Sequence, residues 1–166
     1  MAEDDDLRAD VPFTMRQISV PAFSYVDAKA LPLNDNVGTQ FQFSLRQGVD
    51  QVEELMRLNL KTQLLADAKS LSEGEESIML AEIVTQMEFG ELEVKSREGR
   101  GIVLPTGHVV KMLDMLIGVT RGILSERLQG TPYAGAIMPS MDPIAILDAV
   151  EEKAEIEYRP VESRDV

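Results

Sequence analysis

The chain has 166 residues, of which 44% are hydrophobic and 5% aromatic, so one domain with a mainly aliphatic core is expected. Its net charge of −13 excludes non-specific nucleic-acid binding, because Lys and Arg are too few to neutralise phosphates. It has no Cys, which excludes disulfides and fits a reducing compartment. Because it also lacks a signal-peptide pattern and any run of 18 apolar residues, we expect a cytoplasmic protein that is not embedded in a membrane.

Three segments are expected along the chain. Residues 1–12 are acidic and predict a disordered tail, because a segment with few large apolar side chains cannot offset the entropy of ordering. Residues 13–157 hold the apolar periodicity and predict a single domain. Residues 158–166 are polar and predict a flexible C-terminal tail.

The first two strands are expected near the start of this domain. Residues 15–26 predict a strand, and Pro21 within it favours an edge position or a bulge, since Pro cannot donate to a neighbouring strand. Residues 37–46 alternate apolar and polar side chains, which is typical of a strand with one buried face. Gly48 and Asp50 then supply residues that favour a turn. The first strand joins the second by a longer link through residues 31–33.

Two further strands complete an antiparallel meander. In the third, apolar side chains face one way (Val52, Met56, Leu58, Leu60 and Leu64) and polar ones the other (Glu53, Arg57, Asn59, Lys61 and Gln63). A turn is expected at residues 72–75, before a fourth strand over residues 78–92. The fourth strand is apolar on both faces, so it is either central and covered twice, or one of its faces meets a partner.

The pattern becomes helical after Pro105. Apolar residues recur at steps of three and four over residues 106–128, and Gly130 with Pro132 ends this helix. Gly118 and Gly122 lie inside it, and each destabilises the helix by about 1 kcal/mol relative to Ala. We expect them to let the helix lie close on the sheet.

A loop and a second helix follow. Residues 130–143 hold three prolines and an apolar middle, and loops of this length without secondary structure are often functional. Asp142 and Pro143 predict the start of a second helix, with Asp as its N-cap. A basic stretch over residues 95–101 lacks the spacing of a phosphate-binding loop and predicts a surface loop.

The sequence carries no pattern typical of an enzyme. His108 is the only His, and no nucleophile or carboxylate motif accompanies it, so a structural or surface position is expected. The acidic runs lack the spacing of a calcium loop. We therefore expect no catalytic residue, metal or cofactor, while a small-ligand protein or enzyme built around His108 remains the minor alternative.

Several stretches, taken in order, resemble the SecB-like chaperone family. They are FQFSLRQGVDQVEELMRLNLKTQLLA (41–66), MLAEIVTQMEFGEL (79–92), GILSERLQGT (122–131) and MPSMDPIAIL (138–147). The resemblance implies an α+β fold in which a four-stranded antiparallel sheet is followed by a long amphipathic helix, a Pro-rich loop and a second helix. It also implies an ATP-independent holdase that binds unfolded polypeptides, including preproteins destined for export, as a homotetramer formed from two dimers.

The resemblance further implies which residues contact clients and partners. Client binding would use an apolar groove lined by Tyr133, Ile137, Met138, Met141, Phe89, Met112 and Leu116, and the alternative for each is an ordinary place in the core. A contact with the translocation ATPase SecA would use Leu80 and Glu82. Gln17 and Pro21 stand where the family has acidic residues, so this patch is incomplete. The alternative therefore stays open that the protein is a dedicated chaperone or adaptor for one partner, such as an antitoxin, and is not coupled to SecA.

Overall fold

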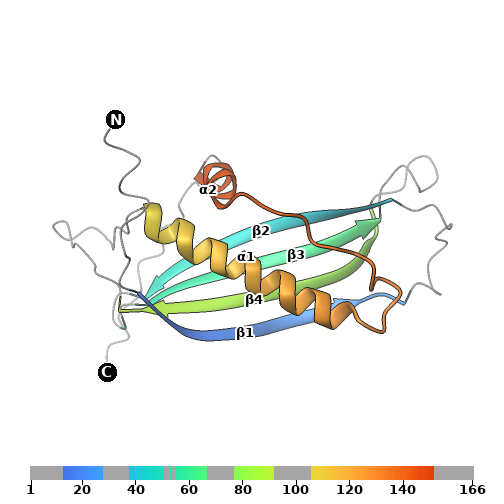
Figure 1. Ribbon diagram of the computed structural model, residues 1–166, viewed down its shortest axis with the longest axis horizontal. Helices are drawn as coiled ribbons and strands as arrows, with labels where there is room; N and C mark the ends of the chain where they lie inside the picture. The colour runs from blue at the N-terminus through green and yellow to red at the C-terminus, as the bar shows by residue number, and fades with distance from the viewer. Residues whose placement is uncertain are drawn as a thin grey trace, which may run out of the picture.

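The described part of the chain forms four strands and two helices (Figure 1). The computed structural model describes residues 13–27, 38–50, 53, 55–66, 77–91 and 106–151. The elements are β1 (Thr14–Tyr25), β2 (Thr39–Asp50), β3 (Leu55–Ala66), β4 (Met79–Gly90), α1 (Thr106–Leu128) and α2 (Pro143–Glu151). The strands form one antiparallel sheet in the order β1-β4-β3-β2, so the predicted α+β class is confirmed.

Some predicted features lie outside the described residues. They are the two tails (1–12 and 158–166), the link at 31–33, the turn at 72–75 and the loop at 95–101.

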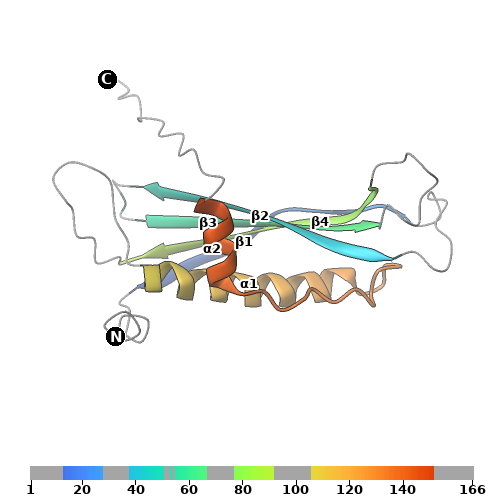
Figure 2. The ribbon, with the colours of Figure 1, turned by 90° about the horizontal axis from the view of Figure 1, so that it is seen from above.

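The sheet has two unlike sides. Helix α1 lies along one of them, which we call the helix side, and no described helix lies on the other, which we call the open face (Figure 2). On β3 the helix side holds Met56, Leu58, Leu60 and Leu64, at most 3% exposed, and the open face holds Arg57, Asn59, Lys61 and Gln63. This confirms the alternation predicted for the third strand from Met56 to Leu64, because successive side chains of a strand point to opposite faces. Glu53, predicted at the start of that strand, lies instead in the turn before it, and Val52 lies outside the described residues.

The core lies between α1 and the two central strands. Fully buried side chains from β3 and β4 meet fully buried side chains of α1 there, among them Leu58, Ile83, Met87, Leu113 and Leu116. Each fully buried Leu contributes about 1.5–3 kcal/mol, so this layer supplies much of the free energy of folding. Strand β4 is central, as one alternative predicted, but no described helix covers its open face, so a partner on that face stays a prediction.

Pro21 lies where the sequence predicted, on an edge strand with an irregularity. Strand β1 pairs only with β4, and its register shifts between Ser19 and Ala22, around Pro21. A missing N–H is tolerated there, because the edge and the bulge leave that position without a partner in the ladder.

Strand β2 is longer than predicted. Gly48 and Asp50 were expected in a turn, but they pair with Arg57 and Leu55 as part of the strand. The turn comes later, where the backbone N–H of Glu53 donates to the Asp50 carboxylate at 3.1 Å. Asp50 fixes the turn through this hydrogen bond. Gly48 is therefore not needed in the turn and is part of the strand instead.

The prediction that two glycines let α1 lie close on the sheet is wrong. Helix α1 has the predicted bounds, and its buried side chains include Met112, Leu116 and Leu124. Gly118 and Gly122, in contrast, are exposed, and a Cβ added at either would meet no atom within 4 Å. The glycines therefore lie on the outer side of α1, away from the sheet.

Candidate functional site: apolar side chains on the helix side

Large exposed apolar side chains gather on the helix side of the molecule. Those of the described residues are Met15, Ile18, Tyr25, Val49, Met115, Ile137 and Ile144, with exposed fractions from 38% to 81%. The four on strands pair with Phe89, Met87, Ala81 and Met56, whose buried side chains face α1. The other three lie on α1, on the segment after it and on α2. None of the seven lies on the open face.

The segment between the helices, residues 129–142, is named the strap here. Figure 1 shows it running back along the sheet from the end of α1 to α2. Gly130 has a φ of 78°, a left-handed conformation that suits Gly and lets the chain turn away from the helix. Thr131 then donates its hydroxyl to the Leu128 carbonyl at 2.7 Å, which satisfies one of the last carbonyls of α1.

Two contacts hold the strap against the rest of the fold. The hydroxyl of Tyr133 donates to the carbonyl of Val26, at the end of β1, at 2.6 Å. The guanidinium of Arg121 on α1 donates to the carbonyl of Pro139 at 3.0 Å. Met138 is buried between these two points, at 3% exposed. The strap is thus fixed on both sides of Ile137, whose side chain is 81% exposed.

The environment of Tyr133 favours its neutral form. Burial raises the pKa of Tyr133 above its ordinary value, and the negative charge of Asp27 raises it further. A neutral phenol keeps the proton that it donates to Val26, so this contact holds throughout the physiological pH range.

Helix α2 begins as predicted. The carboxylate of Asp142 accepts a hydrogen bond from the backbone N–H of Ile144 at 3.0 Å, and Pro143 occupies the first helical position. On α2 the side chain of Leu147 joins the core, while Ile144 stays exposed. The cap therefore fixes where the strap ends and α2 starts.

The residues predicted to bind clients divide into two groups. Among the described residues, Ile137 is the most exposed large apolar side chain, and Met141 is partly buried against the core. Five others are at most 7% exposed and belong to the core of the single chain: Tyr133, Met138, Phe89, Met112 and Leu116. A client could reach these five only if the strap or α1 moved. Their role in binding stays a prediction.

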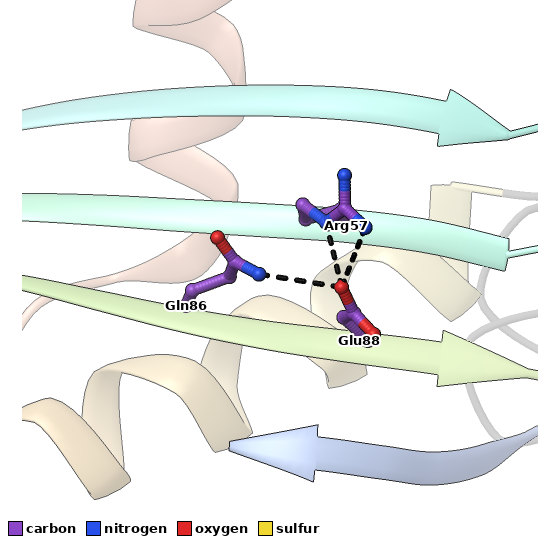
Figure 3. A network of polar contacts seen from close by, with 3 residues as sticks. All are labelled: Arg57, Gln86 and Glu88. Carbon is purple, nitrogen blue, oxygen red and sulfur yellow. Dashed lines mark hydrogen bonds and ion pairs between the residues drawn. The ribbon is translucent and has the colours of Figure 1, made fainter. Parts of the chain in front are cut away.

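Two cross-strand ion pairs occupy the open face. The guanidinium of Arg57 lies 2.6 Å from the carboxylate of Glu88, which also accepts from the Gln86 amide at 3.3 Å (Figure 3). The ammonium of Lys61 lies 2.8 Å from the carboxylate of Glu82. Both acidic groups of β4 on this face are therefore paired with basic groups of β3.

The two residues predicted to contact SecA lie in different environments. Glu82 is on the open face, where the hydrogen bond from Lys61 holds its pKa below the ordinary value against the opposing effect of burial. Gln63 adds a hydrogen bond to the same carboxylate at 2.7 Å. Leu80 is 1% exposed and belongs to the core, because the register shift between β3 and β4 leaves it as an extra residue.

Sequence reasoning missed several of the exposed apolar residues. Met15, Ile18, Tyr25 and Val49 read as ordinary inward-facing strand residues, because their period of two is the same in an edge strand and a central one. Only the strand order, in which β1 and β2 are the edges, shows that they are partly uncovered. Met115 carried a usable signal, since it stands out of phase with the buried residues of α1.

In the part of the chain that the structure describes, no group of three His, Asp or Glu side chains converges to hold a metal ion. None of the helices in that part is long and apolar enough to cross a membrane. His108 lies in the first turn of α1 and is half-buried.

Of the comparisons with known proteins, the one with solved structures gives a match. No protein-family model and no curated protein sequence matches the chain. Among solved structures, the chain is similar to the Mycobacterium tuberculosis Rv1957 SecB-like chaperone in complex with a ChAD peptide from the Rv1956 HigA1 antitoxin. The TM-score is 0.49 and the sequence identity 11%, over 78% of this chain and 90% of that chain. With similarity this low, function has to be inferred from the geometry of this chain.

Proposed function

We propose that this protein is an ATP-independent molecular chaperone, a holdase that binds unfolded polypeptides in the cytoplasm. The observation that carries the proposal is the one-sided distribution of the exposed apolar side chains, all of which lie on the helix side. Large apolar side chains that are exposed together on one side of a protein mark an interaction site. An unfolded chain is the partner that offers apolar side chains without a fixed shape.

The chemistry of such binding needs no nucleotide and no catalytic group. Burying apolar surface contributes about 25 cal/mol per Å², whatever the sequence that supplies it. Beside the exposed Ile137 on the strap, the partly buried Met141 adapts to differently shaped partners because a Met side chain has three rotatable bonds. The same surface can therefore hold many clients.

A homotetramer formed as a dimer of dimers is part of the proposal. Two separate surfaces support it, since a closed tetramer of this kind needs two different two-fold contacts. One surface is the outer side of α1, where Met115 stands beside Gly118 and Gly122 and a second helix could approach closely. The other is the helix side of β1, where Met15, Ile18 and Tyr25 are exposed.

Dedication to one partner, without coupling to SecA, is the second candidate function. The open face supports it, because Glu82 is already bonded to Lys61 and Gln63, and Leu80 is buried. A SecA-type contact through these residues would have to break an ion pair and expose a core side chain. We therefore expect purified SecA to bind weakly or not at all, as measured by calorimetry, and an antitoxin-like peptide to be a better ligand. Binding of SecA that is lost in Glu82→Gln would instead favour export.

The test of the holdase is dilution of a chemically unfolded protein into buffer with and without this protein, followed by light scattering. Ile137→Asp should weaken suppression of aggregation about tenfold or more, because full burial of an Ile contributes about 1.5–3 kcal/mol. Ser140→Asp is the matched control, since it adds the same charge at another exposed position of the strap. Met138→Asp is unsuitable, because Met138 is a core residue and the variant would unfold.

Each outcome decides between hypotheses. Suppression by the native chain that only Ile137→Asp impairs supports the holdase and its site. Suppression that survives Ile137→Asp moves the site away from the strap. An absence of suppression at a molar excess of this protein overturns the holdase and leaves the single-partner adaptor.

A further inference from the structure

Buried threonines interrupt the apolar layer between the helices and the sheet. Among the described residues, the buried polar side chains are those of Thr62 on β3, Thr85 on β4 and Thr120 on α1, each at most 1% exposed. The hydroxyl of Thr120 donates to the carbonyl of Leu116 in its own helix at 2.7 Å. The hydroxyls of Thr62 and Thr85 have no hydrogen-bond partner within the described residues. Their burial therefore costs free energy that a bonded hydroxyl does not cost.

The two unpartnered hydroxyls lie close together on the helix side. Thr85 lies opposite Leu60 of β3, and Thr62 lies opposite Ile83 of β4, so the two Thr residues are diagonal neighbours on adjacent strands. The Cβ atoms of such neighbours are about 7 Å apart. Both strands are central, and α1 covers this side of the sheet (Figure 2). Thr62 and Thr85 therefore form one polar spot in the core, which we call the threonine pair.

The sheet is also irregular beside the threonine pair. The register of β1 shifts between Ser19 and Ala22, and the residue of β4 that falls opposite this shift is Thr85. Pro21, which has no N–H to donate, lies within the shift. Two sources of local instability, an interrupted ladder and a pair of unpartnered hydroxyls, therefore meet in the middle of β4.

Separation of α1 from the sheet would remove the cost of the unpartnered hydroxyls. In a closed layer they have no partner, whereas in an open layer water or a client can hydrogen-bond them. Each hydroxyl should therefore raise the population of the open state about fivefold or more. The same layer buries residues that the sequence predicted to bind clients, among them Phe89, Met112 and Leu116.

We infer that the threonine pair makes the contact between α1 and the sheet a gate. The pair favours separation of α1 from the sheet, and separation exposes Phe89, Met112 and Leu116 to an unfolded client. The inference rests on the proposed holdase function and adds to it how apolar side chains that are buried in the single chain become accessible. Because the client binds the open state, its apparent affinity should fall in proportion to the open population.

Opening can be measured with a single introduced thiol, because the chain has no Cys of its own. Leu113→Cys places the thiol at a fully buried position of α1, and its rate of reaction with an aromatic disulfide reports how often the layer opens. In this background Thr62→Val and Thr85→Val should each slow the reaction about fivefold or more, since Val has the shape of Thr without the hydroxyl. The rates are compared at low urea, because reaction through global unfolding depends steeply on urea.

Thr120→Val is the matched control for the thiol measurement. Thr120 is also fully buried, but its hydroxyl already has a partner in the Leu116 carbonyl. Its replacement removes no unpartnered group, so the reaction rate should change little.

The same substitutions, in the chain without Cys, test whether opening governs client binding. The probe is a fluorescent protein chain whose cysteines are reduced and carbamidomethylated, so that it stays unfolded in buffer. In fluorescence anisotropy, Thr62→Val and Thr85→Val should lower its affinity by the factor by which they slow the thiol reaction. Thr120→Val should keep the native affinity.

The outcomes separate the gate from the proposed function. An unchanged or faster thiol reaction in Thr62→Val and Thr85→Val overturns the gate, because the hydroxyls would then not favour opening. A slower reaction with unchanged client affinity also overturns it, since opening would then not govern binding. Both results leave the holdase standing. A native chain that neither binds the unfolded probe nor suppresses aggregation overturns both.

Discussion

The helix side and the open face are built from the same four strands, yet they differ in how far their side chains find partners within the single chain. On the open face the charged groups of β4 are matched within the sheet, Glu88 with Arg57 and Glu82 with Lys61. On the helix side the apolar side chains outnumber what α1 and the strap cover. The open face thus leaves no charged group of β4 unmatched, whereas the helix side leaves apolar side chains uncovered.

Geometry explains why the helix side stays incomplete. Four strands spaced about 4.8 Å apart span a width of roughly 15–20 Å, whereas one helix with its side chains is about 10 Å wide. Helix α1 packs on β3 and β4, the two central strands, and therefore leaves the edges partly bare. Ile18 on β1 and Val49 on β2 are exposed for this reason. A second copy or a client has to supply the cover that α1 does not give to these edges.

The comparison predicts unequal effects of truncation on the two faces of one strand. Leu60→Ala should lower the free energy of unfolding by about 2–5 kcal/mol, because Leu60 is fully buried and its loss leaves a cavity beneath α1. Asn59→Ala, the adjacent residue on the open face, should change it by about 0.5 kcal/mol or less. Urea unfolding followed by circular dichroism measures both. Equal losses would mean that the open face is covered in solution by a partner.

Much of this arrangement could be predicted from the sequence, because local patterns determine it. Helix α1 has the predicted bounds, since Gly130 ends it, and Asp142 caps α2 as expected. The alternation on β3 also agrees with the prediction, because the two faces of a strand follow from its own sequence, whichever strands lie beside it. The elements and the inward-facing row of β3 thus followed from residues close together in the chain.

The rest depends on contacts between distant residues. Leu80 is buried because β4 carries one residue more than β3 at that point, and no local signal marks such a bulge. Glu82 is bonded to Lys61 because the register places their strands side by side. For the candidate site, the sequence indicated Ile137 and Met141 but not the uncovered residues of the edge strands, since strand order is a property of the whole sheet.

The proposed contact between copies on the outer side of α1 can be tested at its two glycines. Gly122→Ala should stabilise the dissociated chain by about 1 kcal/mol, because a Cβ there meets nothing and Ala is the better helix former. Gly122→Leu should lower the mass of the assembly in analytical ultracentrifugation, since a large side chain would hold a second helix away. Gly118 lies one turn earlier on the same exposed side, so its variants should behave alike. An unchanged mass in both Leu variants would exclude α1 from the contact between copies.

The open face should respond to acid in a way that the helix side does not. The hydrogen bond from Lys61 lowers the pKa of Glu82 in the folded chain, so the pair stabilises the fold above the ordinary Glu pKa. That contribution is lost as the pH falls from the ordinary value near 4.5 through the lower folded-state pKa. Glu82→Gln should therefore reduce the free energy of unfolding by less than about 1 kcal/mol at pH 7, because Lys61 is partly exposed to solvent.

The same variant should match the native chain once the pH lies below the folded-state pKa of Glu82, because the native carboxyl is then also neutral. Glu53→Gln, at an exposed position of the turn between β2 and β3, is the control. It should show no such convergence, and Leu60→Ala should keep its loss at every pH at which the chain folds. A difference between Glu82→Gln and the native chain that persists at low pH would show that Glu82 stabilises the open face through hydrogen bonds that Gln does not reproduce, rather than through its charge.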